Sequence, residues 1–132
     1  MEKILLHKRF LSAVLLLIIL ALPVQGASFK RINDRQFIDI CDKGSEQEII
    51  EALNNGANVN AKDNHGTTAI IFAARSGHLE ALSMLINTGA NVNAKNYDGY
   101  TALIFAAENG HLGVINALIN AGALMLKSVT LT

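Results

Sequence analysis

The sequence predicts an all-α fold: an α-solenoid of about three helix–turn–helix repeats, the first of them degenerate, preceded by an N-terminal signal peptide. The segment GANVNAK occupies residues 56–62 and recurs 33 residues later at 89–95. Residues 63–90 and 96–123 align without a gap and share 15 identities in 28 positions. Self-similarity at such a period is typical of stacked repeats, and about three repeats are needed to bury a continuous core. A chain of 132 residues accommodates that number.

The N-terminal segment, residues 1–26, has the layout of a secretory signal peptide. Basic residues at Lys3, Lys8 and Arg9 precede a 13-residue apolar run, and a proline and small residues follow up to a cleavage point before Ala27. The run is shorter than the roughly 20 residues that span a membrane. We therefore expect an exported protein, periplasmic or secreted. The alternative is a membrane-anchored protein that keeps this segment uncleaved.

The charge and cysteine content exclude several classes of function. Without residues 1–26 the chain has eight basic and ten acidic residues, a net charge of −2, and therefore lacks the basic surface typical of nucleic-acid binding. Its single cysteine, Cys41, excludes an internal disulfide and a multi-cysteine metal site. The expected partner is another protein. We expect no nucleic-acid partner, and no membrane contact once the leader is removed.

The period divides the rest of the chain into three repeats. In the first repeat Gly44 aligns with Gly77 and Ile49 with Leu82, but fewer positions match there than between the later two. The predicted organisation is a short lead-in at 27–36, an array at 37–126 made of repeats 37–62, 63–95 and 96–126, and a C-terminal tail at 127–132.

The middle repeat shows why each unit should contain two helices. The first helix is expected over Thr68–Ser76, with Thr68 as N-cap and Gly77 as the stop, because glycine enters the left-handed conformation without steric cost. The second is expected over Leu79–Asn87, and Gly89 follows it. Small residues in the first helix let neighbouring units approach closely, and large residues in the second form one apolar face: Leu79, Leu82, Leu85 and Ile86.

These features resemble the ankyrin repeat, whose pattern is Gly-x-Thr-Pro-Leu-His-x-Ala-Ala, then Gly-His, then Leu-Leu-x-x-Gly-Ala. The matching segments are GTTAIIFAARSGHLEALSMLINTGANVN and GYTALIFAAENGHLGVINALINAGA, and the resemblance covers residues 37 to about 123. Two departures occur in both units. Ala69 and Ala102 replace the proline, and Ile71 and Ile104 replace the histidine. The resemblance implies that this histidine hydrogen-bonds the threonine, so its loss weakens the polar network between repeats.

The candidate chemical residues are better explained as parts of the scaffold. His78 and His111 recur after a helix-ending glycine, and the repetition predicts that each satisfies loop backbone groups. Cys41 aligns with the packing residue Ala74, which predicts a buried, inert thiol. Three carboxylates, Glu46, Glu48 and Glu51, lie early in a helix, where its dipole stabilises them. No set of residues meets the demands of an active site, so we expect no enzyme, no cofactor and no metal.

The resemblance implies a non-catalytic, exported protein–protein interaction module. Its contacts would lie on the turn tips and on the concave face of the first helices, and Tyr97 and Tyr100 are the sharpest candidates because tyrosine is enriched at interface hot spots. The alternative is a membrane-tethered scaffold or adaptor that keeps the N-terminal apolar segment. The candidate contact residues are Asn64, His65, Thr67, Arg75, Ser76, Tyr97, Asp98, Tyr100, Glu108 and Asn109.

The third copy of the loop departs from the other two. It keeps Gly122 and Ala123 but replaces Asn-Val-Asn with Leu124, Met125 and Leu126. Terminal repeats usually turn a polar face outward, so this apolar segment is unexpected. Three interpretations stay open: the segment folds back over the last helix pair, it mediates self-association through an apolar C-terminal edge, or it is the remnant of a longer array.

Overall fold

The computed structural model describes residues 31–124, and within this range the fold is entirely helical. Two isolated β-bridges, Lys62 with Thr68 and Lys95 with Thr101, close the long loops, and the described range contains no strand. The all-α prediction is confirmed for this range, while the predicted signal peptide and tail lie outside it. The helices are α2 (Asp34–Lys43), α3 (Glu46–Asn54), α4 (Ala69–Ser76), α5 (Leu79–Asn87), α6 (Ala102–Glu108) and α7 (Leu112–Asn120).

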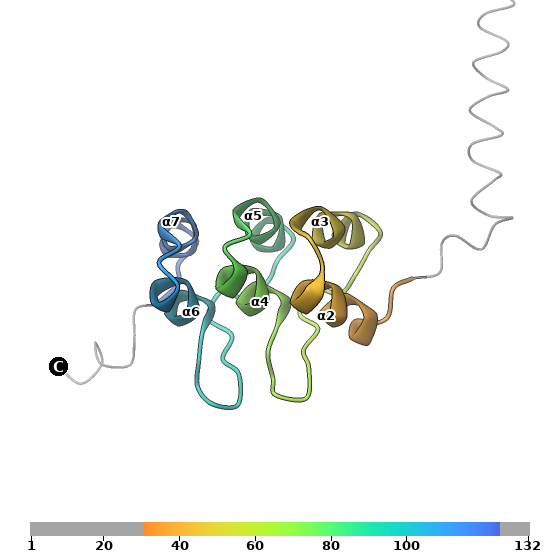
Figure 1. Cartoon of the computed structure of the whole chain (residues 1–132), viewed down its shortest axis with the longest axis horizontal. Coiled ribbons are helices and arrows are strands. Elements are labelled where there is room, and N and C mark those ends of the chain that lie inside the picture. The colour runs from red at the N-terminus through yellow and green to blue at the C-terminus, as the bar shows by residue number, and fades with distance from the viewer. Residues whose placement is uncertain (1–30, 125–132) are drawn as a thin grey trace, which may run out of the picture. The chain divides into compact units, whose positions relative to one another are not determined.

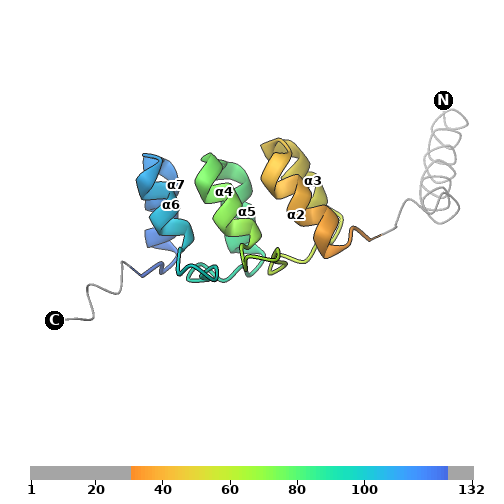
Figure 2. The same cartoon turned by 60° about the horizontal axis from the view of Figure 1, so that its bottom comes forward.

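The six helices form three pairs that stand side by side in a row (Figure 1). The first helices of the pairs, α2, α4 and α6, lie in one layer, and the second helices, α3, α5 and α7, lie in the other. Both views place the loops between successive pairs, residues 55–68 and 88–101, along one side of the row (Figures 1 and 2). The loop tips are therefore close to the first helices and away from the second.

Both helices of the first repeat begin with a capping box. Helix α2 starts at Asp34, inside the predicted lead-in, because Asn33 forms a capping box with Gln36. A second capping box starts α3, where the Ser45 N–H donates to the Glu48 carboxylate at 2.7 Å. That hydrogen bond from the Ser45 backbone lowers the pKa of Glu48, because it favours the charged carboxylate. These local caps stabilise helix ends in the repeat whose sequence departs most from the shared pattern.

The middle repeat matches its predicted elements closely. Helix α5 has the predicted bounds, and Gly77 ends α4 with a φ of +76°. Thr68 occupies the N-cap position of α4, but its side chain makes no capping hydrogen bond, whereas the Thr101 hydroxyl accepts from Ile104 N at 3.3 Å. The Thr68 hydroxyl is buried without a hydrogen-bond partner. Ile71, which replaces the histidine of the repeat pattern, offers this hydroxyl no hydrogen-bonding group, but Ile104 makes the same replacement in the third repeat and Thr101 still forms its cap.

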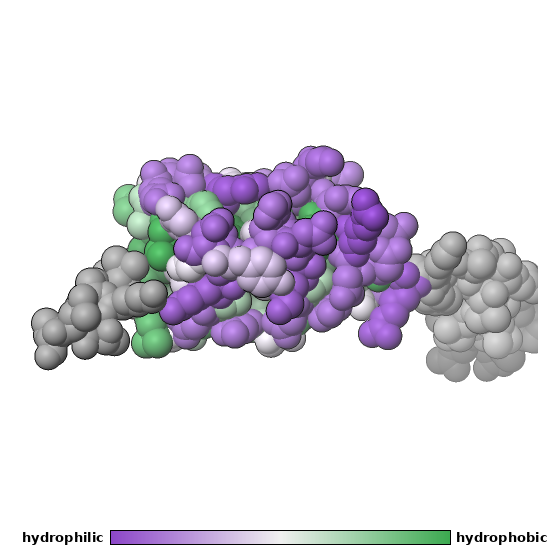
Figure 3. Space-filling model, turned by 90° about the horizontal axis from the view of Figure 1, so that it is seen from below, coloured by the Kyte–Doolittle hydropathy of each residue, from purple (hydrophilic) through white to green (hydrophobic). Residues whose placement is uncertain are grey.

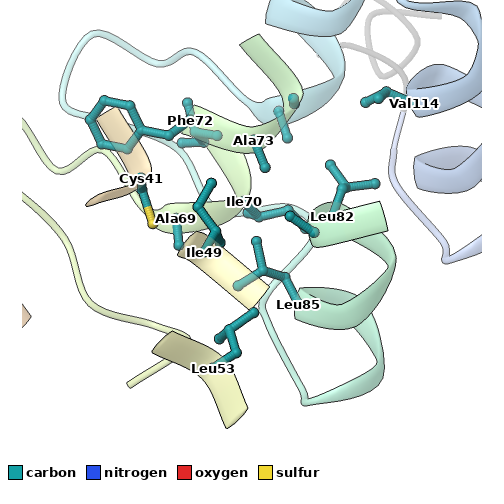
Figure 4. Packing of buried hydrophobic residues seen from close by; sticks show 14 of the residues in the cluster. Cys41, Ile49, Leu53, Ala69, Ile70, Phe72, Ala73, Leu82, Leu85 and Val114 are labelled. Carbon is teal, nitrogen blue, oxygen red and sulfur yellow. The ribbon is translucent and has the colours of Figure 1, made fainter. Parts of the chain in front are cut away.

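The core lies between the two helix layers and continues from repeat to repeat. Ile49, Ile70, Leu82 and Leu85 are fully buried and converge there (Figure 4). The alanines of α4, Ala69, Ala73 and Ala74, are fully buried as well, which lets the neighbouring first helices pack closely. Cys41 belongs to this core, and burial raises the pKa of its thiol to about 12, as expected for an inert packing residue.

Candidate protein-binding surface

We call residues 63–67 and 96–100 the loop tips. Each tip is closed by one side chain that accepts two backbone hydrogen bonds. Asp63 Oδ1 accepts the N–H groups of His65 and Thr67, both at 2.8 Å. Asn96 does the same in the next tip, at 3.1 and 2.8 Å. Short polar side chains thus hold the backbone of each turn from inside, while Asn64, His65, Tyr97 and Asp98 are exposed.

The two tips are also fixed against one another. The Tyr97 N–H donates to the His65 carbonyl at 2.9 Å. The Tyr97 ring lies over Gly66, where a Cβ atom would come within 2.7 Å of the ring. The tyrosine nevertheless stays 72% exposed. A large aromatic side chain is thereby held in a defined position with most of its surface open to solvent.

A second tyrosine stands on the same tip and is supported by the third repeat. The Tyr100 ring stacks on Phe105 of α6, with ring centroids 5.2 Å apart and an interplanar angle of 29°. Tyr100 is 38% exposed. The two predicted hot-spot tyrosines therefore lie three positions apart on one rigid tip, each against a neighbouring group.

On the first helices, the predicted contact residue Arg75 lies beside Asp42, which the sequence prediction did not include. The Arg75 guanidinium forms an ion pair with Asp42 of α2 at 2.8 Å and lies 5.0 Å from the centre of the Phe72 ring. Asp42 aligns with Arg75 in the 33-residue period, and opposite charges at aligned positions were the signal that could have revealed it. Asn109 is exposed but donates its amide to the Phe105 carbonyl at 2.8 Å.

One predicted contact residue, Thr67, is buried. It is only 7% exposed, so its side chain offers little surface to a partner, and its carbonyl accepts the Asp63 N–H as the loop closes. The other nine predicted contacts are exposed: Asn64, His65, Arg75, Ser76, Tyr97, Asp98, Tyr100, Glu108 and Asn109.

A groove on the first repeat adjoins the candidate surface at Asn64. An open groove of about 440 Å³ lies between α2 and the first loop, lined by Asp34, Arg35, Ile38, Asp39, Lys62, Asp63 and Asn64. Its walls are mostly charged and of both signs. The sequence prediction drew its contacts only from the middle and third repeats. The polar character of this whole face is visible in Figure 3, which views the molecule from the side of the loops.

Of the two recurrent histidines, His111 contacts a backbone group across a repeat junction, whereas the His78 side chain makes no capping hydrogen bond at the start of α5. His111 Nε2 lies 3.1 Å from the Arg75 carbonyl, which it satisfies across the repeat junction as predicted. Within residues 31–124 no three His, Cys, Asp or Glu side chains are arranged to hold a metal ion. No helix in that range is long and apolar enough to cross a membrane.

Three stacked helix pairs, with both connecting loops on one side, are the architecture expected from the 33-residue period. A family model described as ankyrin repeats (3 copies) matches residues 37–127. The chain belongs to the ankyrin-repeat family. No curated protein matches its sequence. Ankyrin repeats are generally protein–protein interaction modules and typically lack catalytic activity.

Proposed function

We propose that this ankyrin-repeat chain is a non-catalytic, exported module that binds another protein through its loop tips and the concave side of α2, α4 and α6. The observation that supports this most is the pair Tyr97 and Tyr100, exposed on one tip and held by Gly66 and Phe105. A rigid, exposed aromatic side chain loses little conformational entropy on binding, which is why such residues act as hot spots. Export is supported by the signal-peptide layout of residues 1–26.

The surroundings of the tyrosines favour a protein partner over a small molecule. Small-molecule sites are concave and mostly apolar, whereas the groove beside α2 is open and lined with charged groups. The Arg75–Asp42 pair joins the last turns of α4 and α2, and both side chains are partly exposed. An aromatic centre with a polar rim is the arrangement found in protein interfaces.

Capture and mutation together test the proposal. The chain, used as bait on the envelope fraction of the producing cell, should capture a partner whose affinity for purified chain is then measured. A Tyr97→Ala, Tyr100→Ala variant should lose about 30-fold or more in affinity, the loss expected for hot-spot residues. A Glu51→Ala, Asn87→Ala variant alters exposed residues of α3 and α5 and should bind like the unaltered chain. Full affinity of the tyrosine variant, with its helical circular-dichroism spectrum intact, would exclude this surface.

The alternative is the same module tethered to a membrane by residues 1–26. It is supported by the 13-residue apolar run in that segment. N-terminal sequencing of the protein isolated from the cell distinguishes the two. A mature N-terminus at Ala27 supports export by cleavage, and an N-terminus at Met1 supports the tethered form.

A further inference from the structure

The middle repeat holds its arginine between an aromatic ring and a carboxylate. The Arg75 guanidinium lies 5.0 Å from the centre of the Phe72 ring, which belongs to the same helix, α4. The same guanidinium forms the ion pair with Asp42 at 2.8 Å. A guanidinium is attracted to the face of an aromatic ring and matches the shape of a carboxylate, so both contacts favour this position. The middle repeat therefore has an arginine site that the chain fills itself.

The third repeat keeps the aromatic ring of this site but not the arginine. In the 33-residue period Phe105 aligns with Phe72, and Glu108 aligns with Arg75. Side chains three positions apart on a helix are neighbours, so Glu108 and Phe105 lie on the same side of α6. Phe105 is partly buried, and its ring stacks on Tyr100 with the ring centroids 5.2 Å apart. Two aromatic rings and a carboxylate thus stand where the middle repeat binds its guanidinium.

No basic side chain of the third repeat neutralises this carboxylate. Residues 96–124 contain two carboxylates, Asp98 and Glu108, both exposed, and neither lysine nor arginine. Arg75 is turned away, because its ion pair joins α4 to α2, whereas α6 lies on the other side of α4 (Figure 1). Lys95 precedes the tip and lines the groove between the two loops. Neither carboxylate has an ion-pair or hydrogen-bond partner among the described residues, so a cation from a partner would be the first to pair with them.

Glu108 does not stabilise the helix that carries it. It is the last residue of α6, and the last turn of this helix contains no basic residue, whereas α4 has Arg75 in its last turn. A helix C-terminus carries a partial negative charge and disfavours a neighbouring carboxylate. A cation bound at Glu108 would therefore interact favourably with both the carboxylate and the helix end.

The exposed tyrosines extend the aromatic surface beside these carboxylates. Tyr97 lies over Gly66 and is 72% exposed, and Tyr100 covers part of Phe105. Asp98 lies between the two tyrosines in the sequence of the tip. A purely apolar partner would leave the carboxylates unpaired in the interface, which costs free energy, whereas a cationic side chain can contact both the rings and the carboxylates. We define the acidic aromatic patch as Tyr97, Asp98, Tyr100, Phe105 and Glu108.

We propose that the acidic aromatic patch binds an arginine side chain of the partner protein, with the guanidinium stacked on the exposed rings and paired with Glu108. This inference rests on the proposed function and names the chemistry that the same surface recognises. Arginine fits better than lysine, because its planar guanidinium stacks on aromatic rings and pairs with a carboxylate through two hydrogen bonds. The partner's arginine takes the place at Phe105 that Arg75 has at Phe72.

Three short peptides test the charge and the shape of the bound group without the natural partner. The isotope-labelled full chain is titrated with the blocked tripeptide Gly-Arg-Gly, with its lysine analogue, and with its citrulline analogue, which is uncharged but shaped like arginine. The arginine peptide should shift the backbone signals of residues 97–100 and Glu108, with a dissociation constant in the millimolar range, because exposed cation–π contacts and ion pairs are individually weak. The citrulline peptide should bind at least about five-fold more weakly. Equal binding of the arginine peptide and either analogue, or no shift in the patch, would overturn the proposal.

Variants of the carboxylates separate binding from stability. Asp98→Asn, Glu108→Gln should weaken binding of the arginine peptide about three-fold or more, while the midpoint of urea unfolding does not fall. Glu51→Gln, Glu80→Gln changes two exposed carboxylates of α3 and α5 and should bind like the unaltered chain. Glu108→Arg gives α6 the arginine that α4 has and should abolish binding, because the chain then fills the site itself. Unchanged peptide binding in either patch variant would contradict the proposed contact.

The natural partner, once captured, distinguishes this inference from the proposed function. If Tyr97→Ala, Tyr100→Ala weakens partner binding but Asp98→Asn, Glu108→Gln does not, the surface binds a partner without an arginine, and only this inference is wrong. If neither variant weakens binding, the partner uses another surface, and the proposed function is wrong as well. Losses in both variants, with the Glu51→Gln, Glu80→Gln control unaffected, support both.

Discussion

The two junctions between repeats are built differently, although they join units with the same fold. At the junction of the first and middle repeats, polar side chains reach across. Glu46 Oε1 accepts the N–H groups of Glu80 and Ala81, at 2.6 and 3.0 Å, and so caps α5 from the preceding repeat. The Asp42–Arg75 ion pair, at 2.8 Å, adds a second polar contact. A carboxylate at the start of a helix also interacts favourably with the helix dipole.

The junction of the middle and third repeats depends instead on close approach to glycine. The His111 ring packs on Gly77, where a Cβ atom would lie 2.7 Å from the ring, and its Nε2 reaches the Arg75 carbonyl. The residue aligned with Glu46 is Leu79, which contacts Gly113 and cannot cap α7. One aligned substitution thus exchanges a polar cap for an apolar contact. The stack tolerates either chemistry, provided that the helix spacing is kept.

Both junctions share one feature, which explains the repeated GANVNAK segment. Asn58 and Asn91 close the local turn by accepting the N–H two residues on, at 3.1 and 3.0 Å. Asn60 and Asn93 hold the backbone N–H of the next loop. The residue held by Asn93 is Leu124, which supplies only its backbone N–H. The third copy can therefore carry leucine there without loss of this contact.

The largest expected effect tests the role of glycine at the second junction. Gly77→Ala should cost about 2–4 kcal/mol, because it combines left-handed backbone strain with a steric clash against His111. Gly110→Ala is the matched control, since Gly110 has a φ of +72° and no atom near its Cβ position, and it should cost only about 1–2 kcal/mol. Urea denaturation of the two variants measures the difference. Equal losses would show that the ring contact with Gly77 contributes nothing.

Removing the cap at the first junction should have the next largest effect. Glu46→Ala leaves the N–H groups of Glu80 and Ala81 without their acceptor and should lower the free energy of unfolding by about 1–2 kcal/mol. Glu51→Ala, an exposed carboxylate on the same helix, should change it by less than about 0.5 kcal/mol. Faster amide hydrogen exchange at Ala81 in the Glu46 variant alone would locate the effect. Unchanged exchange there would contradict the assigned cap.

Transferring the polar cap to the second junction should produce a smaller gain. Leu79→Glu places a carboxylate at the position aligned with Glu46, within reach of the N–H groups that start α7. We expect stabilisation of about 0.5–1 kcal/mol, the usual range for a carboxylate near a helix N-terminus. Leu79→Gln is the uncharged control and should gain less. Destabilisation by both variants would mean that the Leu79–Gly113 contact outweighs any cap.

The sequence predicted the repeats well because their signals are local. Helix α5 was predicted with its true bounds from a glycine stop and a regular apolar face. No start was predicted for α2, although the Asn33–Gln36 capping box can be read in the sequence, because the first repeat was placed by alignment to the later repeats, which begins at Phe37. The capping box and the repeat alignment give different starting points, and only the folded structure shows that Asn33 caps the helix.

The exposure of the candidate contact residues was predicted less completely, because exposure depends on the folded loop. Thr67 occupies the last position of its tip, but its backbone closes the loop and its side chain is buried. The contact between Asp42 and Arg75 joins two helices that become neighbours only after stacking. The cap of α5 by Glu46 has the same origin. Such contacts depend on the distance between repeats, which periodicity alone does not give.

The smallest expected effect concerns the ion pair at the first junction. Asp42→Asn removes the charge of a partner whose side chain is 39% exposed, and pairs this accessible to water contribute about 0–1 kcal/mol. The loss should shrink further between 50 mM and 500 mM salt, whereas the loss from Glu46→Ala should persist because it arises from hydrogen bonds to backbone. Urea denaturation at both salt concentrations separates the two. If Asp42→Asn proved as costly as Glu46→Ala at high salt, the first junction would depend on the ion pair as much as on the helix cap.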